Sequence, residues 1–545
     1  MPNIFQIVAN RVDVISGTIS AATIEVNNGI IRSITAAAQS ANRGFLIPGF
    51  VDSHIHIESS MLLPSQFARA AVVHGTVATV SDPHEIANVC GLDGIELMLR
   101  DAAQSPFKFH FGAPACVPAT KFETAGAELN VAAVQQLLND PRIGYLAEMM
   151  DFPGVLSGDT EVLAKIAAAK QLDKPVDGHA PGLRGEEARR YVAAGITTDH
   201  ECFTMDEALD KLNAGCKIAI REGSAARNFD ALWPLIDRYP DDCLLCSDDK
   251  HPDELMLGHI NELVQRAVAN GCDPMNVLRV ASRNPVQHYG LNVGLLQEGD
   301  PADFVLVEDL ESFSVRRTYI GGERVAESGK SLMPAAPIET INQFAATPIF
   351  TSELAIPAEG NRVRVIQVID GQLITESEVA DAKIDNGYVV SDIDHDILKL
   401  VVVNRYEPAK PAVALVRGFG LKGGALASTV AHDSHNVLAV GTSDTALCRA
   451  INAVIDTQGG LSAAVGTEVD MLPLPVGGLM AAGSCEEVAA VYSRLDGRVK
   501  SLGCQLRAPY MTLSFLTLLV IPSLKLSDKG LFDVDRFEFA SLFVS

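Results

Sequence analysis

Short apolar stretches alternate with helical stretches from about residue 45 to residue 291 of this 545-residue chain. Strands that alternate with helices indicate a parallel sheet. Eight such units in about 250 residues match a (β/α)8 barrel, so we predict an α/β fold of the TIM-like barrel kind. The eight strand candidates are 45–53, 77–83, 108–114, 143–150, 174–181, 195–202, 216–223 and 241–249.

Polar side chains gather at the C-terminal ends of these predicted strands, where barrels of this kind keep their active sites. His54 and His56 close the first strand, in PGFVDSHIHIESSML. Alternate side chains of a strand share a face, so both imidazoles can bind one metal ion. The other polar residues at these ends are Asp82, His84, Glu85, Glu148, His179, His200, Glu201, Asp248 and Asp249.

Four histidines with a glutamate and an aspartate on one rim suit a site for two metal ions. Imidazole and carboxylate ligands fit Zn²⁺, Mn²⁺ or Fe²⁺, and two such ions lower the pKa of a shared water so that hydroxide is available near neutral pH. Glu148 can bridge the ions with its two oxygens. Asp248 can ligate one ion, accept the proton of the attacking water and return it to the leaving group. A site for one metal ion is the alternative.

Sequence outside the barrel segment indicates two further domains. Residues 1–44 and 292–345 have the pattern of short strands and turns, and we predict that they pair into one small β-sandwich flanking the barrel of residues 45–291. Residues 350–545 are predicted to form a C-terminal α+β domain. A chain of this length is expected to hold more than one domain.

The chain carries a formal net charge of -25 and has no Lys/Arg-rich run. This balance argues against nucleic acid or an anionic membrane surface as a partner and favours a small neutral or cationic substrate. Ten cysteines follow no regular framework, and the CxxC of Cys243 and Cys246 is interpreted as strand packing. No signal peptide is expected, and the apolar stretch 511–521 is shorter than the roughly 18 to 20 residues of a membrane span. We expect a cytoplasmic protein.

Several blocks of the chain resemble the amidohydrolase superfamily and, within it, the adenine deaminase family, in that family's order. Many members of the superfamily carry a carboxylated lysine on the fourth strand, whereas this chain has Glu148, as adenine deaminases do. The resemblance covers almost the whole chain, including a third domain that most amidohydrolases lack. The blocks are PGFVDSHIHIESSML, SDPHEIANVCG, DGHAPGLRG, AGITTDHEC, SDDKHPDELMLGHI, VAHDSHNVLAVGTSD, LPLPVGGLM and PYMTLSFLTLLVIPSLKL.

The resemblance implies hydrolytic deamination of adenine to hypoxanthine and ammonia, a step of purine salvage, by a metal-activated hydroxide that attacks C6. Glu85 and Glu201 are the two candidates for the acid that protonates N1. The resemblance also implies two divalent ions, Mn²⁺ or Fe²⁺ with Zn²⁺ as the alternative, and a homodimer. The metal ligands that it implies are His54, His56, His179, His200 and Asp248, with Glu148 as the bridge.

Substrate contacts are expected from two parts of the chain, the turn after the second strand and the central segment 423–444 of the third domain. A polar cluster in that segment can reach over the barrel mouth and close the site from water; a satisfied turn within its own domain is the other interpretation. Two rival functions stay open, an amidohydrolase of another nitrogen heterocycle, such as a modified purine or cyclic amide, and a non-catalytic barrel. The residues concerned are Asp82, His84, Glu85, His432, Asp433 and His435.

Overall fold

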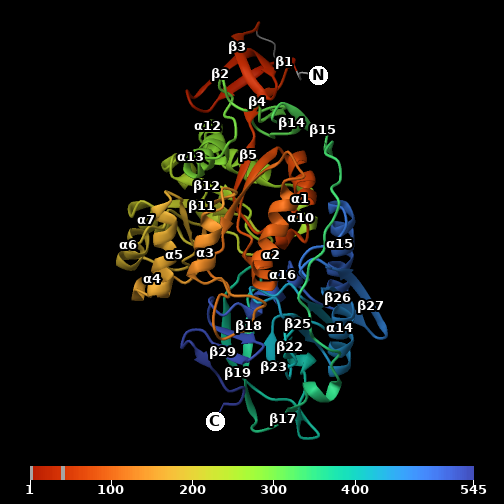
Figure 1. Ribbon diagram of the computed structural model, residues 1–545. Helices are drawn as coiled ribbons and strands as arrows, with labels where there is room; N and C mark the ends of the chain where they lie inside the picture. Colours follow the sequence, from red (N-terminus) through yellow and green to blue (C-terminus); the bar gives the residue numbers. More distant parts are fainter. Residues whose placement is uncertain (1–3, 39–42, 545) are drawn as a thin grey trace.

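The computed structural model describes residues 4–38 and 43–544 (Figure 1). Residues 1–3, 39–42 and 545, at the edges of two predicted domain ranges, lie outside the described residues. Figure 1 shows three bodies stacked along the molecule, with a small sheet at the top, a barrel in the middle and a second mixed domain at the bottom.

The middle body is a nearly closed barrel of eight parallel strands, and the predicted (β/α)8 fold is confirmed. Residues Ile55 and Asp248 form a parallel bridge that brings the first and last strands together. Most strand residues are buried on both faces, which explains their continuous apolar sequence. The strands are β5 (Phe50–Ile55), β6 (Thr76–Ser81), β7 (Lys108–Ala113), β8 (Ile143–Met149), β9 (Val176–Gly178), β10 (Thr198–Asp199), β11 (Lys217–Arg221) and β12 (Cys243–Cys246).

The strand predicted over residues 45–53 is two strands in the structure. Residues Phe45–Pro48 form β4, which pairs with strands of the small sheet, and only β5 belongs to the barrel. Gly49 separates them, and a Cβ atom there would lie 2.3 Å from a methyl group of Val77. The chain therefore passes from one sheet to the other at a point where only glycine fits.

Helices surround the barrel, and polar side chains cap several of their first turns. The side chain of Asp159 accepts hydrogen bonds from the backbone N–H groups of Glu161 and Val162, and Thr204 accepts one from Glu207, as N-cap residues do. The helices of this part are α1 (Pro64–Ala71), α2 (His84–Ala102), α3 (Val131–Leu138), α4 (Phe152–Ser157), α5 (Thr160–Gln171), α6 (Gly185–Ala193), α7 (Met205–Asn213), α8 (Phe229–Leu232), α9 (Leu235–Arg238), α10 (Pro252–Leu257), α11 (Ile260–Ala269), α12 (Pro274–Leu278) and α13 (Asn284–Tyr289).

The small sheet combines strands from both sides of the barrel segment. β4 pairs in parallel with β1 on one side and antiparallel with β13 on the other. The sheet has its own apolar core, which includes Ile24, Leu46, Phe304 and Tyr319. The exact domain boundaries stay a prediction. Its strands are β1 (Ile4–Asp13), β2 (Thr18–Asn27), β3 (Ile30–Ala36), β4, β13 (Phe304–Val307), β14 (Val315–Ile320), β15 (Glu323–Glu327) and β16 (Lys330–Ser331).

The C-terminal body contains an eight-stranded sheet packed against two helices, α14 (Asp444–Asp456) and α15 (Cys485–Ser501). A capping box between Ser484 and Glu487 begins α15. A long segment without helix or strand leads from β16 to this body along the right side of Figure 1. The strands are β18 (Arg362–Val368), β19 (Thr375–Asp381), β22 (Leu398–Val403), β23 (Ala412–Arg417), β24 (Ala425–Ser428), β25 (Val437–Gly441), β26 (Gly460–Val465) and β27 (Glu468–Pro473).

Three pieces of the C-terminal body lie at its boundary with the barrel. They are the connection between β24 and β25, helix α16 (Pro509–Ser514) with the following 3-10 turn η6 (Phe515–Thr517), and the hairpin of β28 (Leu524–Ser527) and β29 (Gly530–Asp533). Figure 1 shows α16 between the barrel and the lower sheet. Among the described residues, no helix has both the length and the apolar character to cross a membrane.

Candidate active site

The two histidines of the HxH motif converge at the end of β5. The Nε2 atoms of His54 and His56 lie 3.2 Å apart, and both side chains are buried. The strand alternation thus brings both imidazoles to one point, as the sequence predicts. His54 also stacks on His200, which follows β10, with ring centroids 4.0 Å apart.

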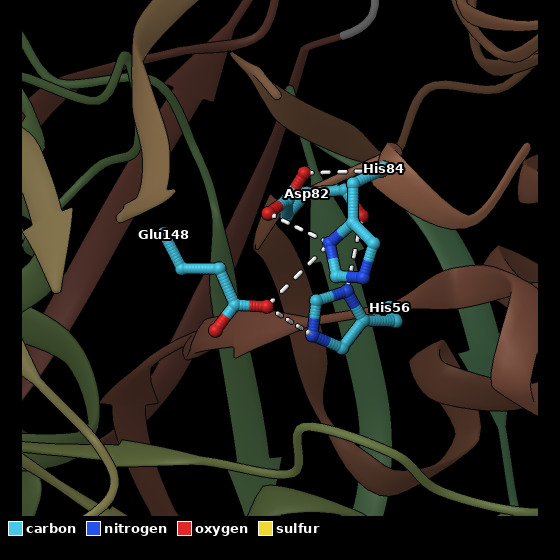
Figure 2. Close-up of side chains that lie close together, drawn as sticks. All are labelled: His56, Asp82, His84 and Glu148. Atoms are coloured by element: carbon cyan, nitrogen blue, oxygen red, sulfur yellow. Dashed lines mark hydrogen bonds and ion pairs between the residues drawn. The ribbon is translucent and has the colours of Figure 1, made fainter. Parts of the chain in front are cut away.

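Glu148, near the end of β8, lies at the centre of the cluster. Its Oε1 is 3.2 Å from Nε2 of His56 and 3.5 Å from Nδ1 of His84 (Figure 2). Its Oε2 is 2.7 Å from Nδ1 of His179 and 3.2 Å from Nε2 of His200. The two oxygens face different pairs of imidazoles, which is the arrangement that a bridging ligand needs.

The turn after β6 supplies Asp82 and His84. Oδ2 of Asp82 lies 3.0 Å from Nδ1 of His84 and fixes the orientation of that ring, as Figure 2 shows. The backbone carbonyl of Asp82 lies 3.2 Å from Nδ1 of His56. His84 therefore lies beside the HxH pair and Glu148. The sequence analysis predicted it only as a substrate contact.

Asp248 follows β12 and reaches the cluster from the opposite side. Its Oδ1 is 3.4 Å from Nε2 of His56, and its Oδ2 is 3.7 Å from Nε2 of His200. The residue has a left-handed backbone conformation, with φ of 54°, and its N–H donates to the carbonyl of His54 at 2.9 Å. This backbone bond fixes the carboxylate relative to the HxH motif.

Arg221 is a site residue that the sequence analysis missed. It lies at the end of β11, is wholly buried, and donates to both Asp248 and Glu201. Like the predicted site residues, Arg221 is a charged residue at the C-terminal end of a mostly apolar strand. The same rule could therefore have identified it. The guanidinium links the carboxylates that follow β10 and β12.

Glu85, at the start of α2, is held by the C-terminal body. Its Oε1 bonds to Nδ1 of His432 and its Oε2 to Nε2 of His435. Nδ1 of His435 accepts the N–H of Ala431 at 3.2 Å, so its Nε2 carries the proton that is donated to Glu85. Oδ1 of Asp433 lies 3.8 Å from Nε2 of His84. The connection between β24 and β25 thus reaches the barrel mouth.

One small cavity joins the two halves of the site. It has a volume of about 20 Å³, enough for about one water molecule and too small for a purine ring. Every predicted site residue lines this cavity or contacts a residue that lines it. A larger hollow of about 340 Å³ lies outside the barrel, between α5 and the end of α6, and contains none of the predicted residues. The predicted residues that line the cavity are His56, His84, Glu85, Glu148, His179, His200, Glu201, Asp248, His432 and Asp433.

Ionisation differs among the clustered histidines. Burial and the adjacent His200 keep the pKa of His54 well below its usual value. Burial also opposes protonation of His56 and His84, but neighbouring carboxylates outweigh it and raise both pKa values well above the usual one. Glu201 and Glu148 likewise overcome burial and raise the pKa of His179 to about 9.

The carboxylates respond in the opposite direction. Burial alone would raise the pKa of Glu148, but the nearby imidazoles, His179 foremost, hold it well below the usual range. Arg221 does the same for Asp248, and His432 and His84 do so for Glu85. Three buried carboxylates around one cavity are therefore ionised.

Family models match both large parts of the chain. The model of the amidohydrolase family matches residues 45–325, and that of the adenine deaminase C-terminal domain matches residues 372–538. A protein from Salinibacter ruber named adenine deaminase is 56% identical over 547 residues, covering 100% of both chains. Proteins of the same name from Sulfurovum sp. and Methanosarcina mazei are 53% and 49% identical, with 97% and 98% of this chain and 98% of each relative covered. The chain belongs to the adenine deaminase family of amidohydrolases.

Proposed function

We propose that this protein catalyses the hydrolytic deamination of adenine to hypoxanthine and ammonia. The observation that carries the proposal is the position of Glu148, whose Oε1 faces His56 and whose Oε2 faces His179 and His200 at the barrel rim. Its full-length relatives with the printed name adenine deaminase support the choice of substrate.

The donor atoms at the rim fit divalent metal ions, which the amidohydrolase family implies. Nε2 of His54, His56 and His200 each lie within 4.0 Å of an oxygen of Glu148, so imidazole donors and a carboxylate meet at one point. When bound, such an ion lowers the pKa of a water so that it becomes a nucleophile near neutral pH. We propose that two ions bind. Mn²⁺ and Fe²⁺ are the first candidates and Zn²⁺ is the alternative, because imidazole and carboxylate ligands suit all three. The proposed ligands are His54, His56, Glu148, His179, His200 and Asp248.

We assign the transfer of the water proton to Asp248. Its carboxylate is ionised, because Arg221 lowers its pKa, and it lies beside the imidazoles of His56 and His200. It accepts the proton of the attacking water and delivers it to the departing amino group at C6. Arg221 holds the carboxylate in place throughout.

Glu85 is the better placed of the two candidates for protonating N1. Both oxygens of Glu201 bond to the guanidinium of Arg221, and an arginine side chain stays protonated in proteins and passes no proton on. Glu85 bonds instead to His432, whose pKa Glu85 and Asp249 raise to about 9 against the effect of burial. A proton on His432 can pass through Glu85 to the ring.

The remaining predicted contacts position the base in this proposal. His84 lies between Glu148, Glu85 and Asp433, and Asp82 fixes its ring. A charged imidazole and an acceptor carboxylate at this point can bind the polar edge of a purine. His435 acts through Glu85, which it holds in place.

A panel of heterocycles tests the proposed function. The purified chain, loaded with Mn²⁺, is assayed for ammonia release from adenine, adenosine, guanine and 2,6-diaminopurine, and for ring opening of dihydrouracil and hydantoin. We expect adenine to give the highest kcat/KM. Faster turnover of a modified purine or a cyclic amide would replace adenine as the substrate, and no turnover of any compound by metal-loaded protein would contradict an enzymatic function.

We also propose a homodimer in the cytoplasm. The dimer rests on the family resemblance. The location is supported by the ten cysteines, all of which are buried and unpaired by disulfides, as expected of a reducing compartment. Light scattering coupled to gel filtration, with an expected mass of twice 58.0 kDa, tests the dimer.

A further inference from the structure

The cavity has an apolar wall that the proposed chemistry does not use. Leu373, Phe515 and Leu518 line it, all from the C-terminal body, and each is at most 5% exposed. The ring of Phe515 stacks on the imidazole of His432, with centroids 4.4 Å apart and planes 15° apart. The wall therefore faces the polar rim across the space where the substrate must bind.

These wall residues come from two segments that are distant in the chain. Leu373 lies between β18 and β19, whereas Phe515 and Leu518 lie in and directly after η6. Neither wall segment is part of the large sheet. Hydrogen bonds of Thr375 tie the first segment to Pro522 and Leu524, and those of His432 with Ser514 and Thr517 tie the second to the connection between β24 and β25. None of these bonds joins one wall segment to the other.

Lys525 of β28 contacts both wall segments. Its side chain is wholly buried, and Nζ donates to the carbonyl of Leu373 at 2.8 Å and to the carbonyl of Phe515 at 2.9 Å. One amino group thus joins both wall segments through the backbone of the very residues that line the cavity.

The surroundings of Lys525 are unusual for a lysine. No carboxylate among the described residues forms an ion pair with it, and burial lowers its pKa to about 7. A neutral amine has two N–H bonds, which match the two carbonyls. An unpaired buried ammonium is costly, and an apolar side chain would avoid that cost. What the amine adds is the bond to each wall segment.

We propose that Lys525 is a positioning residue that holds the wall of Leu373, Phe515 and Leu518 against the face of the bound purine. The inference rests on the proposed function for the identity of the base. Because the cavity has room for about one water molecule, the residues that line it have to move apart when the substrate enters. Lys525 then determines the position to which the wall returns.

The first test compares Lys525→Met with Lys399→Met. Lys399 is a matched control, since it is also buried in the C-terminal body and bonds to a backbone carbonyl, that of Leu354, and to Asp444, away from the cavity. Contacts made equally in the ground state and the transition state affect KM rather than kcat. We expect Lys525→Met to raise KM for adenine by about tenfold and to change kcat by less than about threefold. Lys399→Met should leave both constants unchanged.

A second measurement does not depend on the substrate. Hydrogen–deuterium exchange should become faster in peptides covering residues 369–376 and 513–520 of Lys525→Met, and should keep its wild-type rate there in Lys399→Met. If the wild type fails to deaminate adenine, the proposed function is wrong, but the exchange rates still decide the role of Lys525.

Three outcomes overturn the proposal. The first is an unchanged KM, and the second is an unchanged exchange rate in the two wall peptides of a folded Lys525→Met protein. Lys525→Gln keeps an N–H donor and covers the case in which the methionine variant does not fold. If neither variant folds while Lys399→Met does, Lys525 supports the domain as a whole, which is the third contrary outcome.

Discussion

Two buried glutamates, Glu148 and Glu85, are each held between imidazoles, and they differ in where those imidazoles come from. Glu148 lies among histidines that all follow strands of the same barrel. Glu85 is held by His432 and His435, which belong to the C-terminal body. A glutamate between imidazoles therefore occurs once within the barrel, at Glu148, and once where the barrel meets the C-terminal body, at Glu85.

The atoms that face each glutamate show what the difference means. Around Glu148, ring nitrogens of His54, His56, His179 and His200 lie within 4.0 Å of its two oxygens, and the carboxylate of Asp248 lies beside two of these rings. Around Glu85, His432 and His435 each bond to one oxygen, and Nδ1 of His435 accepts the N–H of Ala431. The first cluster brings more donor atoms to one point and suits metal ions, whereas the second suits holding a proton and joins the two bodies.

Glu148→Gln should have the largest effect. An amide keeps the size of the side chain but loses the charge between the two pairs of imidazoles, so we expect less metal per chain and a fall in kcat by about a thousandfold, equivalent to several kcal/mol. Elemental analysis and steady-state kinetics measure both. A variant with full metal content and a near-normal rate would show that Glu148 is not a metal ligand and does not differ from Glu85 in that respect.

Asp248→Asn is expected to be next in size. A group that moves a proton in the transition state affects kcat and kcat/KM together, by about a hundredfold or more. Metal content has to be measured alongside, because the same carboxylate is a proposed ligand. A metal-replete variant with normal turnover would transfer the proton role to another group.

Glu85→Gln separates the two clusters directly. We expect kcat to fall by about tenfold to a hundredfold, because proton delivery to N1 is impaired, while metal content stays at the wild-type value. Loss of metal from this variant would mean that Glu85 belongs to the metal site, and the contrast between the two glutamates would disappear.

His432→Gln should lower kcat by no more than Glu85→Gln does, and its smaller, separate effect is a pH-dependent loss of stability. The pKa of His432 is raised to about 9 in the folded state, above the roughly 6.5 of an unfolded chain. Its contribution is therefore complete below pH 6.5 and is lost as the pH rises through about 9. We expect the variant to melt a few degrees below the wild type at pH 6, and by a smaller margin above pH 9.

A control for that measurement is His395→Gln. His395 is 73% exposed and pairs with Asp392 at 2.7 Å on the surface, where an ion pair contributes little. Its Tm should match the wild type at both values of pH. An equal Tm difference for His432→Gln at pH 6 and above pH 9 would count against a protonated His432 in the folded protein.

The sequence predicts the barrel half of the site well because each residue there follows a strand. The rule that strand ends meet at one rim brings His54, Glu148, His200 and Asp248 together without any knowledge of packing. Arg221 obeys the same rule, but a single arginine ending a strand was not recognised among the histidines and carboxylates. The break between β4 and β5 at Gly49 was also missed. The apolar sequence continues through it, and the strands that pair with β4 and β5 lie elsewhere in the chain.

The other half depends on packing between distant segments. His432 lies 347 positions from Glu85 in the chain, and no periodicity relates them. The sequence indicated that a polar cluster could reach the barrel mouth, but the pairing with Glu85 depends on how two bodies dock. The same holds for Lys525, whose apolar neighbours in β28 give no sign of the carbonyls that it binds.

The pairing of β4 constrains the order of folding during synthesis. One edge of β4 bonds to β1, which is already complete when β4 leaves the ribosome. Its other edge bonds to β13, which is translated only after the entire barrel. Because domains tend to fold as they emerge, the barrel has to form while its neighbouring sheet still has an open strand edge, and an exposed edge invites pairing with other chains. The part of this protein most exposed to wrong pairing during synthesis is therefore expected to be the small sheet and not the site of the chemistry.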